Sequence, residues 1–346
     1  MQFKDGSYLV DLHNHLDATL SANVLRQIAG RKRIKLDDNF ETEIMNFESL
    51  SEFVRRWSLF GHIFAGDSVA IEELTYDILK RETEIGVAYL ELRFAPFLLS
   101  TQSVFYRNVE GFQPNVHNQA QAIAAVKQAV VKGMNDFGIQ VRLILAAVRT
   151  FYEFNKEMAD LGIREELVVG FDTAGDEIAP MSAEEFDTLN YMYSLAGQHN
   201  LGRTCHAGEA GPSDNIRKAV EDFEVSRIGH GYALYTDLEL AKKLQTNDIH
   251  FELCPISSVR IPKPEFLQNL STIYRWFFTK YKNYSINSDG SMFFENVNSS
   301  IDLCKLKCQM TEEQALHAQL NAASHAFLSK EDKESLIQHI KVHFRK

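Results

Sequence analysis

Continuous apolar runs alternate along the chain with stretches in which apolar residues recur every three or four positions. The runs at residues 140–148 and 167–175 are typical of parallel strands that are covered on both faces. Residues 118–136 have apolar side chains at helical spacing, and Gly138 follows them as a glycine often follows a helix. Further strands are predicted at residues 8–12, 87–96, 226–231, 249–255 and 284–290, and at a short run that ends with His206. The pattern therefore predicts eight strands separated by helical stretches.

This alternation indicates a parallel sheet with helices packed on it. Eight strands in one chain fit a closed (β/α)8 TIM barrel better than an open, doubly wound sheet. The length of 346 residues allows two domains or one large barrel, but no linker, low-complexity tract or repeat divides the chain. We therefore expect a single α/β barrel domain over residues 1–346.

Residues 20–84 contain no clear strand and show helical periodicity instead. They predict a helical insertion after the first strand. Such an insertion can lie over the mouth of the barrel and add apolar lid residues to a pocket. An ordinary packed helical subdomain explains the same pattern, and the two arrangements can coexist.

The charge balance of the chain bears on its partners. The 36 basic and 47 acidic side chains give a net charge of -11, which disfavours binding to nucleic acid or to an anionic membrane surface. No apolar run approaches the ~20 residues needed to cross a bilayer, and the chain does not open on an apolar signal stretch. We expect a cytoplasmic protein with a small-molecule substrate. The sequence does not indicate the oligomeric state.

The four cysteines do not have the dense spacing of a disulfide framework, which fits a reducing compartment. Cys304 and Cys308 could supply half of a zinc site. The same spacing places two buried cysteines on one face of a helix, and we favour that interpretation.

Histidine and aspartate side chains stand at the ends of several predicted strands. His13 and His15 follow the first strand, and their spacing places both rings on one side of an extended chain. His206, His230 and Asp289 end the fifth, sixth and eighth strands, and catalytic residues of TIM barrels lie at this end of the strands. Three or more imidazoles with a carboxylate suit a divalent transition metal, with zinc first by ligand type.

Two glycines mark further strand ends that suit ligand binding. Gly208 breaks the fifth strand just after His206, which lets Glu209 turn toward the same cavity. The fourth strand ends at Gly175, where the backbone can approach a ligand closely. An isolated histidine near a glutamate is often structural, so the prediction of a site depends on the number of strand ends that carry such residues.

Six short motifs, in this order along the chain, resemble those of the adenosine deaminase family, which lies within the metal-dependent amidohydrolases. The motifs are HNHLD at residues 13–17, DTAGDE at 172–177, HAGE at 206–209, RIGHG at 227–231, CPIS at 254–257 and SINSD at 285–289. The resemblance covers nearly the whole chain. It implies a TIM barrel that uses one zinc ion per chain to deaminate a purine.

The resemblance also implies roles for individual residues. The implied zinc ligands are His13, His15, His206 and Asp289. Glu209 would be the acid that faces the purine ring, and His230 would flank the attacking water. Asp17 would meet the sugar, the backbone of Gly175 would contact the base, and His15 would also lie near the substrate.

The implied reaction is hydrolytic deamination of a 6-aminopurine nucleoside, foremost of adenosine to inosine, with release of ammonia. Bound zinc would lower the pKa of a water molecule from 15.7 toward about 7. Glu209 would protonate the ring nitrogen beside C6, Asp289 would accept the proton of the water, and His230 would orient the water. The alternatives are a modified adenine, an adenine nucleotide or another amino-heterocycle as substrate, or a barrel that binds a ligand without catalysis.

Two positions depart from the family pattern. Gly290 follows Asp289 where the family commonly has a second aspartate, which normally meets the five-membered ring of the purine. Ala18 follows Asp17 where the family usually has glycine. Because a hydrogen bond to the base would be missing, we expect Gly290→Asp to raise kcat/KM for adenosine about tenfold.

Overall fold

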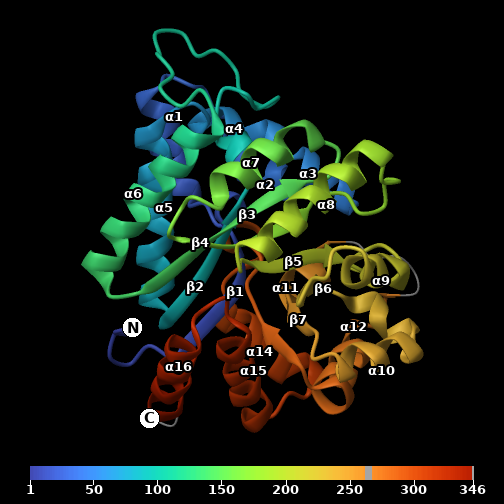
Figure 1. Ribbon diagram of the computed structural model, residues 1–346. Helices are drawn as coiled ribbons and strands as arrows, with labels where there is room; N and C mark the ends of the chain where they lie inside the picture. Colours follow the sequence, from blue (N-terminus) through green and yellow to red (C-terminus); the bar gives the residue numbers. More distant parts are fainter. Residues whose placement is uncertain (262–266, 345–346) are drawn as a thin grey trace.

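The centre of the molecule is a barrel of eight parallel strands, each hydrogen-bonded to the next in the order β1 to β8 (Figure 1). The structure is a computed structural model that describes residues 1–261 and 267–344. The strands are β1 (Leu9–His15), β2 (Val87–Phe94), β3 (Gln140–Val148), β4 (Val168–Ala174), β5 (Gly202–Ala207), β6 (Arg227–His230), β7 (His250–Leu253) and β8 (Tyr284–Ile286). An isolated parallel bridge between Asn14 and Asp289 brings the segment after β8 back to β1. The predicted (β/α)8 barrel is confirmed.

Helices surround the barrel and follow its strands in the chain (Figure 1). The first half of the chain contains α1 (Ala22–Arg31), α2 (Phe40–Ile44), α3 (Leu50–Arg55), α4 (Trp57–Phe64), α5 (Ser68–Glu84), α6 (Gln119–Phe137) and α7 (Asn155–Gly162). The second half contains α8 (Ala183–Gln198), α9 (Ser213–Glu221), α10 (Leu238–Thr246), α11 (Pro255–Arg260), α12 (Leu270–Trp276), α13 (Ser291–Phe294), α14 (Val297–Cys308), α15 (Glu312–His325) and α16 (Lys330–His343). Short 3-10 turns include η1 (Leu16–Ala18) directly after β1 and η4 (Tyr232–Thr236) after β6.

The segment between β1 and β2 is helical, as its periodicity predicts. Its last helix, α5, packs against α6 in the outer layer of the barrel, so α5 belongs to the regular strand and helix alternation. The shorter helices α1 to α4 are additional to that alternation and lie together at one end of the molecule (Figure 1).

Local sequence signals explain where several helices begin and end. The Asn118 side chain caps α6, and Gly138 ends it in the left-handed conformation with φ +74°. Thr311 and Gln314 form a reciprocal capping box at the start of α15, and Ser329 caps α16. Cys304 and Cys308 lie on α14 as buried free thiols, which matches the helix interpretation rather than the half zinc site.

The eighth strand is shorter than the predicted span of residues 284–290 and ends at Ile286. Asn287 instead donates its backbone N–H to Leu253 O, and Asp289 takes a left-handed conformation with φ +69°. The left-handed residue interrupts the extended backbone after β8, and Asp289 pairs with Asn14 of β1 only through an isolated bridge. Among the described residues, no helix has the length and apolar character that a membrane span requires.

Candidate active site

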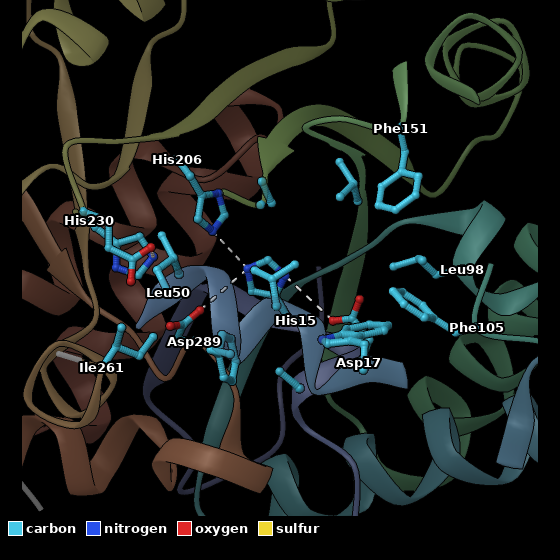
Figure 2. Close-up of a pocket in the computed structure, with 18 residues that line it drawn as sticks. His15, Asp17, Leu50, Leu98, Phe105, Phe151, His206, His230, Ile261 and Asp289 are labelled. Carbon is cyan, nitrogen blue, oxygen red and sulfur yellow. Dashed lines mark hydrogen bonds and ion pairs between the residues drawn. The ribbon is translucent and has the colours of Figure 1, made fainter. Parts of the chain in front are cut away.

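A pocket opens at the carboxyl ends of the strands and combines a polar floor with apolar walls (Figure 2). The polar residues that line it are His15, Asp17, His206, Glu209, His230 and Asp289. The apolar wall includes Leu50, Phe53 and Val54 of α3 and Trp57 of α4. The helices after β1 therefore supply apolar residues to the pocket, in accord with the first of the two arrangements considered for them.

The four predicted metal ligands converge at the floor of this pocket. One ligand atom from each of His13, His15, His206 and Asp289 can be chosen so that all four lie within 4.8 Å of one another. Nε2 of His15 is 3.1 Å from Nε2 of His206, and Oδ1 of Asp289 is 3.6 Å from Nε2 of His15. Figure 2 shows His15, His206 and Asp289 directed toward one another.

The backbone of Asp289 is held against β1. Asp289 donates its N–H to His13 O, and its own carbonyl accepts the N–H of His15, each at 2.8 Å. Because His13 and His15 are themselves candidate ligands, these two hydrogen bonds fix three of the four donors relative to one another. The left-handed backbone of Asp289 is a strained conformation that non-glycine residues adopt at functional sites.

Two buried carboxylates orient the imidazole rings from behind. Nδ1 of His13 is 2.8 Å from Oε2 of Glu252, and Nδ1 of His206 is 3.1 Å from Oδ2 of Asp172. An imidazole that donates its Nδ1–H to a carboxylate directs its Nε2 lone pair away from it. For both residues that lone pair is directed toward the shared centre.

The two carboxylates remain ionised because a buried guanidinium joins them. Arg93 contacts Asp172 at 2.9 Å and Glu252 at 2.8 Å. Burial alone would raise the pKa of Asp172, but His206 and Arg93 outweigh it and hold that pKa well below its ordinary value. Burial likewise opposes ionisation of Glu252, yet Arg93 and Arg227 hold its pKa well below the usual range.

The donor set fits a divalent metal such as zinc. Nε2 of His13 is buried and has no hydrogen-bond partner in the described part of the chain. Burial and His206 lower the pKa of His15 well below its ordinary value, so its ring is neutral at pH 7 and has a lone pair to share. Three imidazoles and one carboxylate around one point are ligands that zinc accepts.

A second, overlapping group contains a thiol. It consists of His13, His230, Cys254 and Asp289, again with ligand atoms within 4.8 Å. Burial and then Asp289 raise the pKa of the Cys254 thiol well above its ordinary value. Because the thiolate is the form that binds metals, the set with His15 and His206 is the better candidate.

Glu209 and His230 lie beside the candidate metal ligands. Oε2 of Glu209 is 3.7 Å from Nε2 of His230, and both side chains are buried and line the pocket. His230 ends β6 with φ +63°, and its Nδ1 is 3.4 Å from the hydroxyl of Tyr232. Two groups that can exchange protons therefore border the space in front of the metal ligands.

Asp17 and Gly175 also border the pocket. Oδ1 of Asp17 is buried without a hydrogen-bond partner among the described residues. Burial and the nearby Asp289 raise the pKa of Asp17 well above its ordinary value. Gly175 has φ +99°, which favours glycine and leaves its backbone at the pocket wall.

The two positions that depart from the family pattern, Ala18 and Gly290, touch each other. A Cβ atom at position 290 would lie 2.4 Å from Ala18 Cβ and 2.6 Å from Ala18 O. The space that a side chain at position 290 would need is filled by η1, so the structure opposes the expected gain from Gly290→Asp.

Several residues of the site were not predicted as members of it. Glu252, Arg93 and Tyr232 were not singled out from the sequence, and Asp172 was noted only as the start of a motif. A signal for the first two exists, because Glu252 and Arg93 are charged residues within the otherwise largely apolar strands β7 and β2. Alternation within those strands would have placed both side chains inside the barrel.

Comparison with known proteins identifies the family. The family model described as adenosine deaminase matches residues 9–343. The chain belongs to the adenosine deaminase family. It is therefore a hydrolase that acts on carbon–nitrogen bonds of the amidine type.

Similar proteins and solved structures of the same fold match over most of the chain. The adenosine deaminase of Danio rerio is 32% identical over 342 residues, which cover 96% of this chain and 94% of that protein. A cog1816 amidohydrolase from Burkhoderia ambifaria with bound Zn superposes with a TM-score of 0.84 at 19% identity and covers 98% of this chain and 91% of its own. The N6-mAMP deaminase of Arabidopsis superposes with a TM-score of 0.76 at 20% identity and covers 97% and 98%.

Loss of the carboxylate behind His206 should weaken metal binding. In Asp172→Asn the neutral amide forms a weaker hydrogen bond with the Nδ1–H of His206 than the carboxylate does. We therefore expect zinc affinity to fall about 10- to 100-fold. Competition with a chromophoric zinc chelator measures this affinity. Asp187→Asn on the exposed face of α8 is the matched control and should bind zinc as the unmodified protein does. Unchanged affinity in folded Asp172→Asn would contradict this account of the ligand set.

Substitution at Gly290 should now be harmful. Gly290→Asp forces η1, and with it Asp17, to move, so we expect kcat/KM to fall at least about tenfold and the free energy of unfolding to fall by about 1–3 kcal/mol. Steady-state kinetics and urea unfolding test both. Gly30→Asp on α1, where no atom lies within 4 Å of the added Cβ, controls for the chemistry of the change. A gain in kcat/KM would contradict this prediction and show that η1 can move without loss of activity.

Proposed function

We propose that the protein is a zinc-dependent aminohydrolase that converts adenosine, or a close 6-aminopurine nucleoside, to the 6-oxo product and ammonia. One observation carries the proposal. The donor atoms of His13, His15, His206 and Asp289 converge at the floor of a pocket that Glu209 and His230 also line. The family membership of the chain supports the same reaction class.

The residues of the pocket divide the reaction between them. His13, His15, His206 and Asp289 would hold the metal. When bound, zinc supplies a Lewis acid that lowers the pKa of a water molecule toward about 7. Glu209 donates a proton to the ring nitrogen beside C6, which neutralises the charge that enters the ring as C6 becomes tetrahedral. His230 orients the attacking water, and Asp289 accepts one proton of that water and passes it to the departing amino group, which leaves as ammonia. The second proton of the water leaves the new hydroxyl group as the C6 carbonyl forms and restores the acid form of Glu209.

The pocket wall bears on the choice between nucleoside and nucleotide. Among the described lining residues there is no lysine or arginine, and Asp17 adds a carboxyl group where the sugar is expected. A 5′-phosphate would therefore meet apolar side chains such as Leu98 and Phe105 without a cationic partner. This favours an uncharged nucleoside, in agreement with the adenosine deaminases to which the chain is similar.

A second candidate substrate keeps the same chemistry on a modified adenine or an adenine nucleotide. Because residue 290 is glycine, this position offers no carboxyl group to bind the base, so base recognition can differ from the family pattern. The N6-mAMP deaminase of Arabidopsis, which has the same fold, is named for such a substrate. A barrel without catalysis is disfavoured because the whole ligand set is present.

Formation of the 6-oxo product from four substrates separates these candidates, because N6-methyl-AMP would release methylamine where the other three release ammonia. We expect kcat/KM for adenosine to exceed that for AMP, N6-methyl-AMP and adenine by at least about tenfold, since the phosphate lacks a cation and the free base lacks the sugar contact. Removal of zinc by a chelator should abolish turnover and added zinc should restore it. Preference for either nucleotide would move the second candidate ahead, and activity in metal-free protein would refute the zinc mechanism.

Replacement of the predicted acid should separate catalysis from metal binding. In Glu209→Gln we expect zinc content to remain one ion per chain while kcat falls at least about 100-fold, because an amide cannot donate the required proton. Glu184→Gln, at an exposed position of α8, should change neither quantity. Metal analysis with steady-state kinetics makes the comparison. Loss of zinc with retention of rate after reconstitution would show that Glu209 has been misassigned.

A further inference from the structure

The turn that carries Glu209 is organised by one buried carboxylate from another loop. The two oxygens of Glu177, in the segment after β4, accept the backbone N–H groups of Gly208, Ala210 and Gly211 at 2.7, 2.5 and 2.8 Å. The side chain of Asn215 donates to the same carboxylate at 3.1 Å. Three N–H groups that flank Glu209 on both sides thus share one acceptor.

The surroundings of Glu177 keep this carboxylate anionic. Its side chain is buried, which opposes ionisation, but Arg149 and the N–H groups of Gly211 and Ala210 outweigh burial and lower its pKa. Arg149 is also buried and donates from Nη2 to His206 O at 2.8 Å. The cation that favours the charged form of Glu177 therefore also holds the backbone of a candidate metal ligand.

We propose that Glu177 is a positioning residue for Glu209, and that it sets the acid at a fixed place relative to His206. This inference rests on the proposed function, in which Glu209 donates a proton to the purine ring. Glu177 does not line the pocket and touches no reacting atom, so its effect passes through the backbone of the turn.

The bonding pattern requires a carboxylate rather than an amide. Oε1 of Glu177 accepts from Ala210 and Gly211, and Oε2 accepts from Gly208 and Asn215. An ionised carboxylate offers about four lone-pair sites for these four donors. The amide oxygen of a glutamine can accept from only one of these two pairs of donors. Its NH2 group would then face the N–H groups of the other pair, whichever way the amide is oriented. The turn then loses hydrogen bonds on one side of Glu209.

The test is Glu177→Gln with Glu185→Gln as matched control. Glu185 is a buried glutamate that, like Glu177, lies near Arg149, but it has no hydrogen bond to the turn after β5. For Glu177→Gln we expect kcat to fall about 10- to 100-fold with KM within about threefold and one zinc ion retained, because a small displacement of a catalytic group costs rate more than binding. For Glu185→Gln we expect kcat within about threefold of the unmodified protein.

A second measurement is independent of the substrate. Backbone amide exchange of a peptide over residues 206–212 should be faster in Glu177→Gln than in the unmodified protein and in Glu185→Gln, because one or two of the three backbone N–H groups lose their acceptor, depending on the orientation of the amide. Unchanged exchange would overturn the inference even if the substrate assignment is right. Faster exchange in a protein that does not deaminate adenosine would instead refute the proposed function and leave the positioning intact.

Three kinetic outcomes would also overturn the inference. The first is an unchanged kcat in Glu177→Gln, and the second is an equal loss of kcat in Glu185→Gln. The third is a loss of kcat in Glu177→Gln that occurs together with loss of zinc, or with a thermal midpoint too low for a folded protein. Glu177→Asp retains the charge but shortens the side chain by one methylene. We expect Glu177→Asp to have a kcat and an exchange protection between those of Glu177→Gln and the unmodified protein. If only the charge of Glu177 mattered, Glu177→Asp would match the unmodified protein in both.

Discussion

The interior of the barrel depends on the ionised carboxylate of Glu252. Its oxygens contact side chains from four other strands. These are Arg93 of β2 at 2.8 Å, Arg227 of β6 at 2.7 Å, Thr204 of β5 at 3.0 Å and His13 of β1 at 2.8 Å. All five side chains are buried, and removal of one charged partner from a buried ion pair costs about 3–5 kcal/mol. The carboxylate thus ties four strands to β7 and aligns a candidate metal ligand with the same set of contacts.

The pocket follows from this arrangement. Charges that lie deep in the barrel are paired with one another, while the imidazole nitrogens that they orient remain directed toward the mouth. Apolar side chains of α3 and α4 line the walls, and an apolar wall strengthens electrostatic interactions at the floor. One layer of charge therefore serves both the packing of the barrel and the chemistry expected at its end.

The sequence was informative where a functional side chain lies at the end of a predicted strand. Eight apolar runs and a histidine or aspartate at the ends of four of them were sufficient to predict the barrel and to bring His13, His15, His206 and Asp289 to one end of it. The links among buried charges were not predicted, because the contact of Arg93 with Asp172 depends on the stagger of strands that are not adjacent. The contact of Ala18 with Gly290 depends on a turn whose left-handed residue no periodicity reveals.

The bridge between Asn14 and Asp289 joins the first strand to the segment after the last one. During synthesis on the ribosome, His13 and His15 leave the exit tunnel long before Asp289, so the nascent chain holds an incomplete set of ligands for most of its translation. The barrel closes only when this late segment reaches β1, and loop closure over almost the whole chain makes that step a slow one. Assembly of the candidate metal ligands and closure of the barrel are therefore one event, and a newly made chain brings all four candidate ligands together only once it has folded.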